Sequence, residues 1–117
     1  MAEEGIYIYS IIGGEGEARN QNFGLIGINN QEVNLIYYQD IAAVVSHTPV
    51  VNFDRLDKTE LTKYVAIHQK VNEEITKNFD IVPMAFGIIA PSSDEVSRIL
   101  EKAYFQFKMA LKNIIGK

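Results

Sequence analysis

The sequence predicts an α+β domain in which a mostly antiparallel sheet carries two helices packed on one face, as a variant of the ferredoxin-like architecture. Residues 5–47 consist mainly of short apolar runs that are rich in β-formers and separated by turn residues. Residues 57–79 and 92–114 instead repeat apolar side chains every three or four positions, the spacing of amphipathic helices. This order of strands, helix, strand and helix favours an α+β domain.

The chain has the length of one domain. With 117 residues and no repeat of helical or strand units, residues 1–117 are expected to form a single α+β domain. Hydrophobic residues make up 47% of the chain and charged residues 22%, the composition of a globular protein with a real core.

The first predicted strand, residues 5–12, is apolar on both of its alternating faces. We therefore expect it to lie in the interior of the sheet. Strict alternation would divide its side chains into two sets, Ile6, Ile8 and Ser10 against Tyr7, Tyr9 and Ile11.

Further strands follow a glycine-rich stretch at residues 13–22. Residues 23–28 fit a short strand or a turn, and residues 33–38 and 41–47 fit two strands. The dipeptide Gln39-Asp40 between the last two strands is compatible with a tight hairpin turn or a β-bulge.

Two helix starts can be read from capping residues. Asp57 precedes the first helix, and Ser92 with Glu95 three positions later forms a capping box before the second. Residues 81–89 have strand character, but Pro83 has no N–H to donate and indicates an edge position.

Composition excludes several classes of protein. The chain lacks Cys, which excludes a disulfide scaffold and a cysteine nucleophile. Its formal charge of −4 and the absence of a basic patch argue against nucleic-acid binding. No apolar run approaches the roughly 20 residues that span a bilayer, and the acidic start does not resemble a signal peptide. We therefore expect a cytoplasmic protein without membrane or nucleic-acid partners.

The sequence offers no catalytic, cofactor-binding or metal-binding residue. His68 lies at the centre of the apolar stripe of the first helix, and the only other histidine, His47, ends a strand. Because a metal site needs several ligands and a nucleophile needs a nearby base, we expect His68 to be packed and hydrogen-bonded. Residues 13–16 could form a loop around a phosphate group, but the carboxylates of Glu15 and Glu17 would repel it.

Apolar side chains at two places predict contacts with other proteins. Two helices cover only one face of a sheet, so the apolar face that bears Tyr7 and Tyr9 would need a cover from outside. On the last helix Phe105 and Met109 are four positions apart and project away from the apolar stripe that contains Phe107. We therefore expect Tyr7, Tyr9, Phe105 and Met109 to lie at protein interfaces.

The order of these segments resembles the gas vesicle protein F/L (GvpF/GvpL) family. The resemblance is carried by the opening strand at 6–12, the strand at 40–46, the helix with His68, the segment 81–87 and the end of the last helix at 111–117. The most specific piece is Pro83-Met84-Ala85-Phe86-Gly87 after the histidine-bearing helix. Family members often carry a basic residue where this chain has Ala85, and a Thr-like residue where it has Ile88, so polar roles of those positions do not transfer.

The resemblance implies a non-enzymatic accessory or minor structural protein needed for gas vesicle formation. Its implied partners are the hydrophobic gas vesicle shell protein, other gas vesicle accessory proteins and a missing C-terminal domain of the same chain. Family chains continue beyond the equivalent of residue 117, so the resemblance makes this chain an N-terminal domain. Its expected location is the cytoplasm, in association with gas vesicles.

Two alternatives from other classes remain open at this point. A four-stranded sheet that displays Tyr7 and Tyr9 could stack the bases of single-stranded RNA, although the acidic charge opposes this function. A ferredoxin-like domain could also bind a small regulatory molecule, which a ligand-induced rise in melting temperature would reveal.

Overall fold

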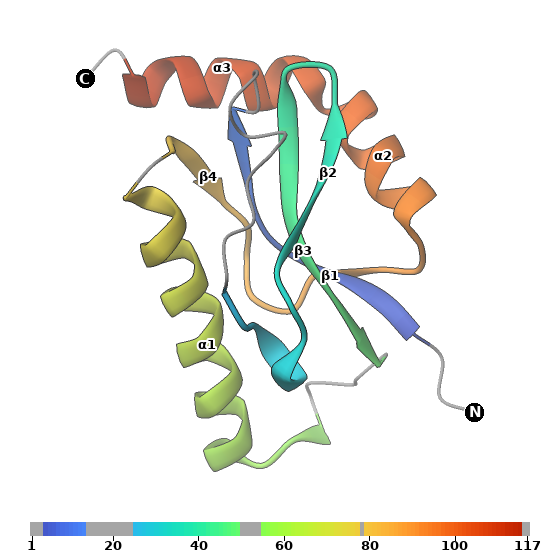
Figure 1. Cartoon of the computed structure of the whole chain (residues 1–117), viewed down its shortest axis with the longest axis vertical. Helices are drawn as coiled ribbons and strands as arrows, with labels where there is room; N and C mark the ends of the chain where they lie inside the picture. The colour runs from blue at the N-terminus through green and yellow to red at the C-terminus, as the bar shows by residue number, and fades with distance from the viewer. Residues whose placement is uncertain (1–3, 14–24, 50–54, 78, 116–117) are drawn as a thin grey trace.

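The computed structural model describes residues 4–13, 25–49, 55–77 and 79–115 (Figure 1). In chain order its elements are β1 (Glu4–Gly13), the 3-10 turn η2 (Ile28–Asn30), β2 (Asn34–Tyr38), β3 (Ile41–Pro49), α1 (Lys58–Thr76), β4 (Ile81–Pro83), β5 (Ile89–Ala90), α2 (Ser93–Lys102) and α3 (Tyr104–Ile115).

The sheet is antiparallel at every described pairing. Its strand order is β2-β3-β1-β4, and β5 pairs with β1 beyond the end of β4. β1 is therefore an interior strand, as its two apolar faces predicted. The predicted class, an α+β domain built on an antiparallel sheet, is confirmed.

The predicted placement of two helices on one face is wrong. α1 covers one face of the sheet through Val71 and Ile75, whereas α2 and α3 cover the other face through Val96, Leu100 and Leu111. In Figure 1 α1 lies to the left of the sheet, while α2 and α3 lie to the right and across the top. The physical reason is that β1 and β3 are apolar on both faces, so each face needs a helical layer.

A β-bulge changes the facing of side chains along β1. Its register with β3 shifts between Ile8 and Ser10, so Tyr9 is an extra residue without an opposing partner. Beyond the bulge Ile11 joins the core under α2 and α3, and Ser10 pairs with Val44, which belongs to the core under α1. The strict alternation expected from the sequence is therefore wrong for Ser10 and Ile11.

The remaining strand predictions are confirmed in part. Tyr38 pairs with Ile41 around the two-residue turn Gln39-Asp40, so the hairpin alternative is correct and the bulge alternative is not. Ile26 forms an isolated bridge with Glu32 beside η2, which fits the predicted short strand or turn; residues 14–24 lie outside the described residues.

The segment predicted as one strand at 81–89 is two short strands, β4 and β5, joined by residues 84–88. Pro83 ends β4, and Gly87 has a φ of 95°, which glycine adopts without strain.

The predicted helix starts are confirmed, but the last helix is broken. The side chain of Asp57 accepts from the Glu60 N–H at 2.8 Å, and that of Ser92 accepts from the Glu95 N–H at 3.2 Å. Ala103 leaves helical geometry, with φ −106° and ψ 18°, and separates α2 from α3. The break lets both helices follow the same face of the sheet with different directions (Figure 1).

Candidate functional site

A polar network lies in the core between α1 and β1. His68 is only 6% exposed, and its Nδ1 lies 2.8 Å from the Tyr7 hydroxyl. That hydroxyl accepts from the Gly87 N–H at 3.0 Å, so its own proton is available to His68 Nδ1. Nε2 then carries the ring proton and donates to the Met84 carbonyl at 3.0 Å. The network thus joins a strand, a helix and the 84–88 loop.

A second branch of the network begins at Tyr9. The Tyr9 hydroxyl accepts from the Ile28 N–H at 2.9 Å and shares a hydrogen bond of 2.7 Å with the Ser46 hydroxyl. The Asn72 amide donates to the Tyr9 carbonyl at 3.1 Å, next to the bulge. Tyr9 therefore connects η2, β3 and α1.

The electrostatics of the network keep its members uncharged. Burial lowers the pKa of His68, and the hydrogen bond to Met84 opposes this shift. Burial raises the pKa of the Tyr7 and Tyr9 hydroxyls. Neutral groups that hydrogen-bond to one another and to the backbone hold the fold in place, and this matches the expected packed and hydrogen-bonded role of His68.

The interface prediction for Tyr7 and Tyr9 is not supported by their position. Both side chains are fully buried, at 0% exposure, because α1 and η2 cover the face of the sheet that bears them. Neither ring can stack on a base or contact a partner protein while α1 is in place. The observation that favoured single-stranded RNA binding is therefore lost.

The surface next to the network offers little to a small ligand. A shallow hollow between α1 and β4 is lined by His68, Asn72 and Pro83 among others. Both ring nitrogens of His68 already have partners, so the ring has no free atom for a ligand. Among the described residues no three His, Cys, Asp or Glu side chains gather into a possible metal site. Small-molecule binding stays a prediction.

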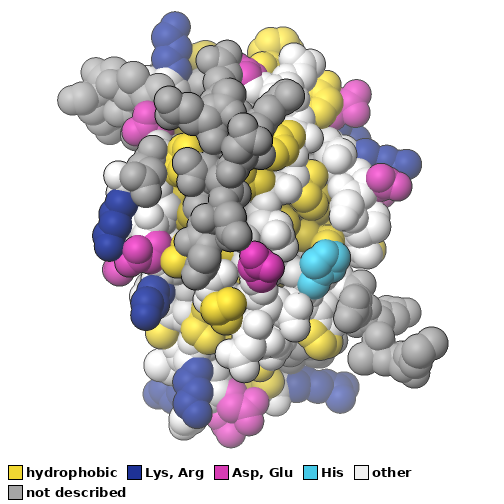
Figure 2. Space-filling view, viewed as in Figure 1, with side chains coloured by type: hydrophobic (Ala, Val, Ile, Leu, Met, Phe, Trp, Pro, Cys, Tyr) yellow, Lys and Arg dark blue, Asp and Glu magenta, His cyan; other side chains and the backbone are white. Residues whose placement is uncertain are grey.

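The outer face of α3 carries two of the three large hydrophobic side chains that are exposed among the described residues. Phe105 is 78% exposed and Met109 is 60% exposed, whereas Tyr104, Phe107 and Leu111 pack against the sheet. Hydrophobic side chains accordingly reach the surface over α3, at the top of the view in Figure 2. The exposure that the interface prediction requires is observed, and the contact itself stays a prediction.

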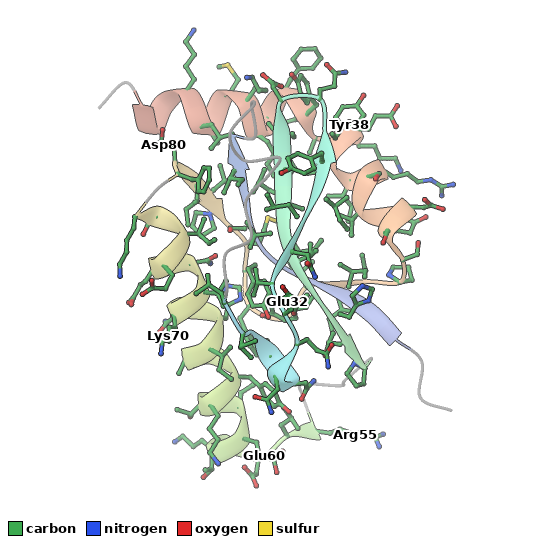
Figure 3. The ribbon with its side chains drawn as sticks, viewed as in Figure 1. Glu32, Tyr38, Arg55, Glu60, Lys70 and Asp80 are labelled. Carbon is green, nitrogen blue, oxygen red and sulfur yellow. The ribbon has the colours of Figure 1, made fainter. Side chains whose placement is uncertain are left out.

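A clamp at the start of α3 was not predicted from the sequence. The Tyr104 hydroxyl and the Lys108 ammonium donate to the two carboxylate oxygens of Asp40, which lies in the β2–β3 turn. The hydrogen bonds from Lys108 and Tyr104 hold the pKa of Asp40 below its usual value. The Tyr38 ring meets the Tyr104 ring edge-on, with centroids 5.7 Å apart, and in Figure 3 it lies beside the junction of α2 and α3. The clamp joins the start of α3 to the β2–β3 turn.

These residues gave different signals in the sequence. Asp40 and Tyr104 are 64 positions apart, and nothing local pairs them. The spacing of Tyr104 and Lys108, four positions apart on a helix, could have suggested a common target. Asn72, four positions after His68 on the apolar stripe, was a detectable sign that the stripe covers buried polar groups.

No helix among the described residues combines the length and the apolar character that a membrane span requires.

Comparison with known proteins identifies a family and a fold. The family model of the gas vesicle synthesis protein GvpL/GvpF matches residues 5–117. The chain is similar to the crystal structure of gas vesicle protein GvpF from Microcystis aeruginosa, with a TM-score of 0.71 and 20% identity over 93% of this chain. It is also similar to GvpF from Anabaena sp. PCC7120, with a TM-score of 0.69 and 18% identity over 94% of this chain. A search of curated proteins finds no match.

The chain belongs to the GvpL/GvpF family of gas vesicle synthesis proteins. It spans 43% of the length of each of the two solved GvpF chains.

Proposed function

We propose that this chain acts in gas vesicle formation as a non-enzymatic accessory or minor structural protein. Its membership of the GvpL/GvpF family supports a role connected with gas vesicles. We further propose that it acts in the cytoplasm and at the gas vesicle, by binding other proteins.

One observation carries this proposal, the exposed apolar pair Phe105 and Met109 on α3. The pair lies one helical turn apart on a helix whose opposite side already packs against the sheet. Large aromatic and Met side chains are enriched in protein interfaces, where they become buried on binding. The proposed partners are the gas vesicle shell protein, other gas vesicle accessory proteins, or a C-terminal domain of the same chain.

The interior of the domain supports a binding role over a catalytic one. The titratable side chains in the core, His68, Tyr7 and Tyr9, are shifted toward their neutral forms and hydrogen-bonded to one another, to Ser46 or to the backbone. These hydrogen bonds connect β1 to α1, to β3 and to the 84–88 loop. The proposal therefore assigns function to α3 and stability to the network.

The test replaces both exposed side chains, Phe105→Ser with Met109→Ser. Because surface changes usually stay within about 0.5 kcal/mol each, the isolated domain should keep its stability in urea denaturation. Binding of the purified shell protein should fall by roughly 1–2 kcal/mol or more for each side chain that acts as an anchor. Gas vesicle formation in cells, measured by buoyancy, should fall with it.

Ile26→Ser is the matched control. Ile26 is also a large exposed apolar residue, at 58%, but it lies beside η2 and away from α3. The Ile26→Ser variant should bind the shell protein and form gas vesicles as the wild type does. A double variant that folds, binds the shell protein fully and forms vesicles would remove α3 from the interface, and one that unfolds would place the pair in the core.

A further inference from the structure

The charge of α3 differs from that of the chain as a whole. α3 contains Lys108 and Lys112 and no Asp or Glu, whereas the whole chain has a formal charge of −4. α2, by contrast, begins with Asp94 and Glu95. The exposed apolar pair therefore lies on a helix without acidic side chains, in a chain that is acidic as a whole.

The two lysines of α3 have different positions. Lys108 is paired with Asp40, on the side of the helix that faces the β2–β3 turn. Successive residues turn by about 100°, so Lys112 lies roughly 20° from Phe105 around the helix axis and on the same outer face as Met109. Lys112 is exposed, and no ion pair is found for it among the described residues. Within the part of the chain that the structure describes, its charge is therefore unpaired.

The clamp prepares this face for binding. Tyr104 and Lys108 hold both oxygens of Asp40, and the Tyr38 ring packs against Tyr104. Together with the packing of Phe107 and Leu111 on the sheet, these contacts favour one arrangement of the outer side chains. Ordering them before binding reduces the entropy that association costs.

We propose that the outer face of α3 docks on an apolar protein surface flanked by carboxylates. Phe105 and Met109 enter the apolar part of that surface, and Lys112 pairs with an Asp or Glu beside it. Complementary charge at the rim of an apolar contact speeds association and disfavours basic surfaces. This inference rests on the proposed function and adds the chemical nature of the partner.

The first experiment identifies what α3 touches. A photoreactive benzophenone amino acid is placed at Gln106, an exposed position beside the apolar pair, in cells that form gas vesicles. After irradiation the cross-linked peptide is sequenced by mass spectrometry. We expect a segment of another protein in which Asp or Glu lies within one helical turn of large apolar residues. Cross-links to lipid, to a second copy of this chain, to a C-terminal domain of the same chain, or to a segment with Lys or Arg at those places overturn the inference.

The second experiment measures how much the charge of Lys112 contributes to binding of the partner found by cross-linking. Lys112→Glu should weaken binding roughly threefold to tenfold at low ionic strength, because it replaces an attraction at the rim by a repulsion. The difference should shrink at high salt, which screens exposed charges. Lys63→Glu, an equal charge change at an exposed position on α1, should leave the affinity unchanged. Circular dichroism and melting temperature confirm that both variants fold.

The outcomes separate this inference from the function on which it rests. If Phe105→Ser with Met109→Ser abolishes binding but Lys112→Glu does not weaken it, the partner is not acidic and only this inference fails. If the double variant binds its partner and forms vesicles normally, the proposed role of α3 fails as well.

Discussion

The two faces of the sheet are closed by different kinds of contact. Under α1 the core contains polar side chains, and Tyr7, Tyr9, His68 and Asn72 reach partners on other elements or on the backbone. Under α2 and α3 the core cluster is apolar, and the polar contact at its edge is the Asp40 clamp at the surface. One face is specified by buried hydrogen bonds and the other by aliphatic packing.

The two faces differ in their proposed roles: the hydrogen bonds under α1 stabilise the fold, and the outer side of α3 is the proposed binding surface. Buried hydrogen bonds have strict geometry, so they fix the bulge of β1 and the 84–88 loop in one arrangement. Aliphatic packing tolerates more variation, and on that side the Asp40 clamp adds a polar contact at the start of α3. The exposed pair Phe105 and Met109 lies on the outer side of α3, and the inner side of this helix is held on the sheet mainly by apolar packing.

The largest expected effect is loss of a side chain from the aliphatic face. Leu100 is fully buried against the sheet, so Leu100→Ala should lower the free energy of unfolding by roughly 2–5 kcal/mol. Phe105→Ala, on the outer side of the neighbouring helix, should change it by no more than about 0.5 kcal/mol. Urea denaturation measures both. Equal losses would mean that Phe105 is packed and that the outer face of α3 is not free.

The second-largest effect is expected at Gly27, where a substitution tests how tightly the Tyr9 ring is held in the core under α1. A Cβ added at Gly27 would lie 2.1 Å from the Tyr9 hydroxyl oxygen and 3.3 Å from a Val33 methyl. Gly27→Ala should therefore displace the ring, break its hydrogen bonds and cost about 1–3 kcal/mol. At Gly13 an added Cβ meets nothing within 4 Å, so Gly13→Ala is the control and should be nearly neutral. A neutral Gly27→Ala would show that Tyr9 can relocate freely.

A smaller effect with a pH signature is expected at His68. His68→Gln should cost roughly 1–2 kcal/mol at neutral pH, because its hydrogen bonds to Tyr7 and Met84 are rebuilt only in part.

The sign of the pH effect follows from the lowered pKa of the folded state. The unfolded chain, with a His pKa of about 6.5, takes up this proton at higher pH than the native state does. Wild-type stability should therefore fall as pH drops below about 6.5, and His68→Gln should lose that part of the slope. His47→Gln, at an exposed histidine, is the control. A stoichiometric metal bound through His68 would contradict the structural role.

The smallest effect is expected at the clamp. Asp40→Asn removes a partly exposed ion pair and should cost less than about 1 kcal/mol at neutral pH. Because the folded pKa of Asp40 is lowered, its contribution is present above the unfolded value of about 3.9 and is lost as pH falls through the folded value. The difference in the free energy of unfolding between the wild type and Asp40→Asn should therefore disappear at acidic pH. Asp80→Asn, at an exposed carboxylate, is the control.

Local signals in the sequence were sufficient for most elements. The 3.6-residue period predicted α1, and Asp57 and Ser92 marked the starts of α1 and α2 through their own hydrogen bonds. The break at Ala103 was missed, because the apolar stripe continues across it and gives no sign of the change in direction. The division of 81–89 into two strands was missed because the loop is held by distant side chains, Tyr7 and His68.

For the candidate site the structure shows the exposure that the prediction for α3 requires, whereas the side chains predicted to lie at an interface on β1 are buried. The exposure of Phe105 and Met109 follows from helix geometry once the inner stripe is known, and the structure has them exposed. Tyr7 and Tyr9 lie on an apolar strand face, and a pattern of alternation cannot tell whether the chain itself or a partner covers that face.

The sequence by itself determined the family, the α+β class, the helix starts and the amphipathic phase of α3, since each depends on residues close together in the chain. Only the tertiary structure decided that the helices take opposite faces, that the bulge at Tyr9 redirects β1, and that Asp40 reaches Tyr104 across 64 positions. These features depend on which surfaces come into contact when the whole chain folds. Burial of both sheet faces is a property of the whole domain, and no single segment encodes it.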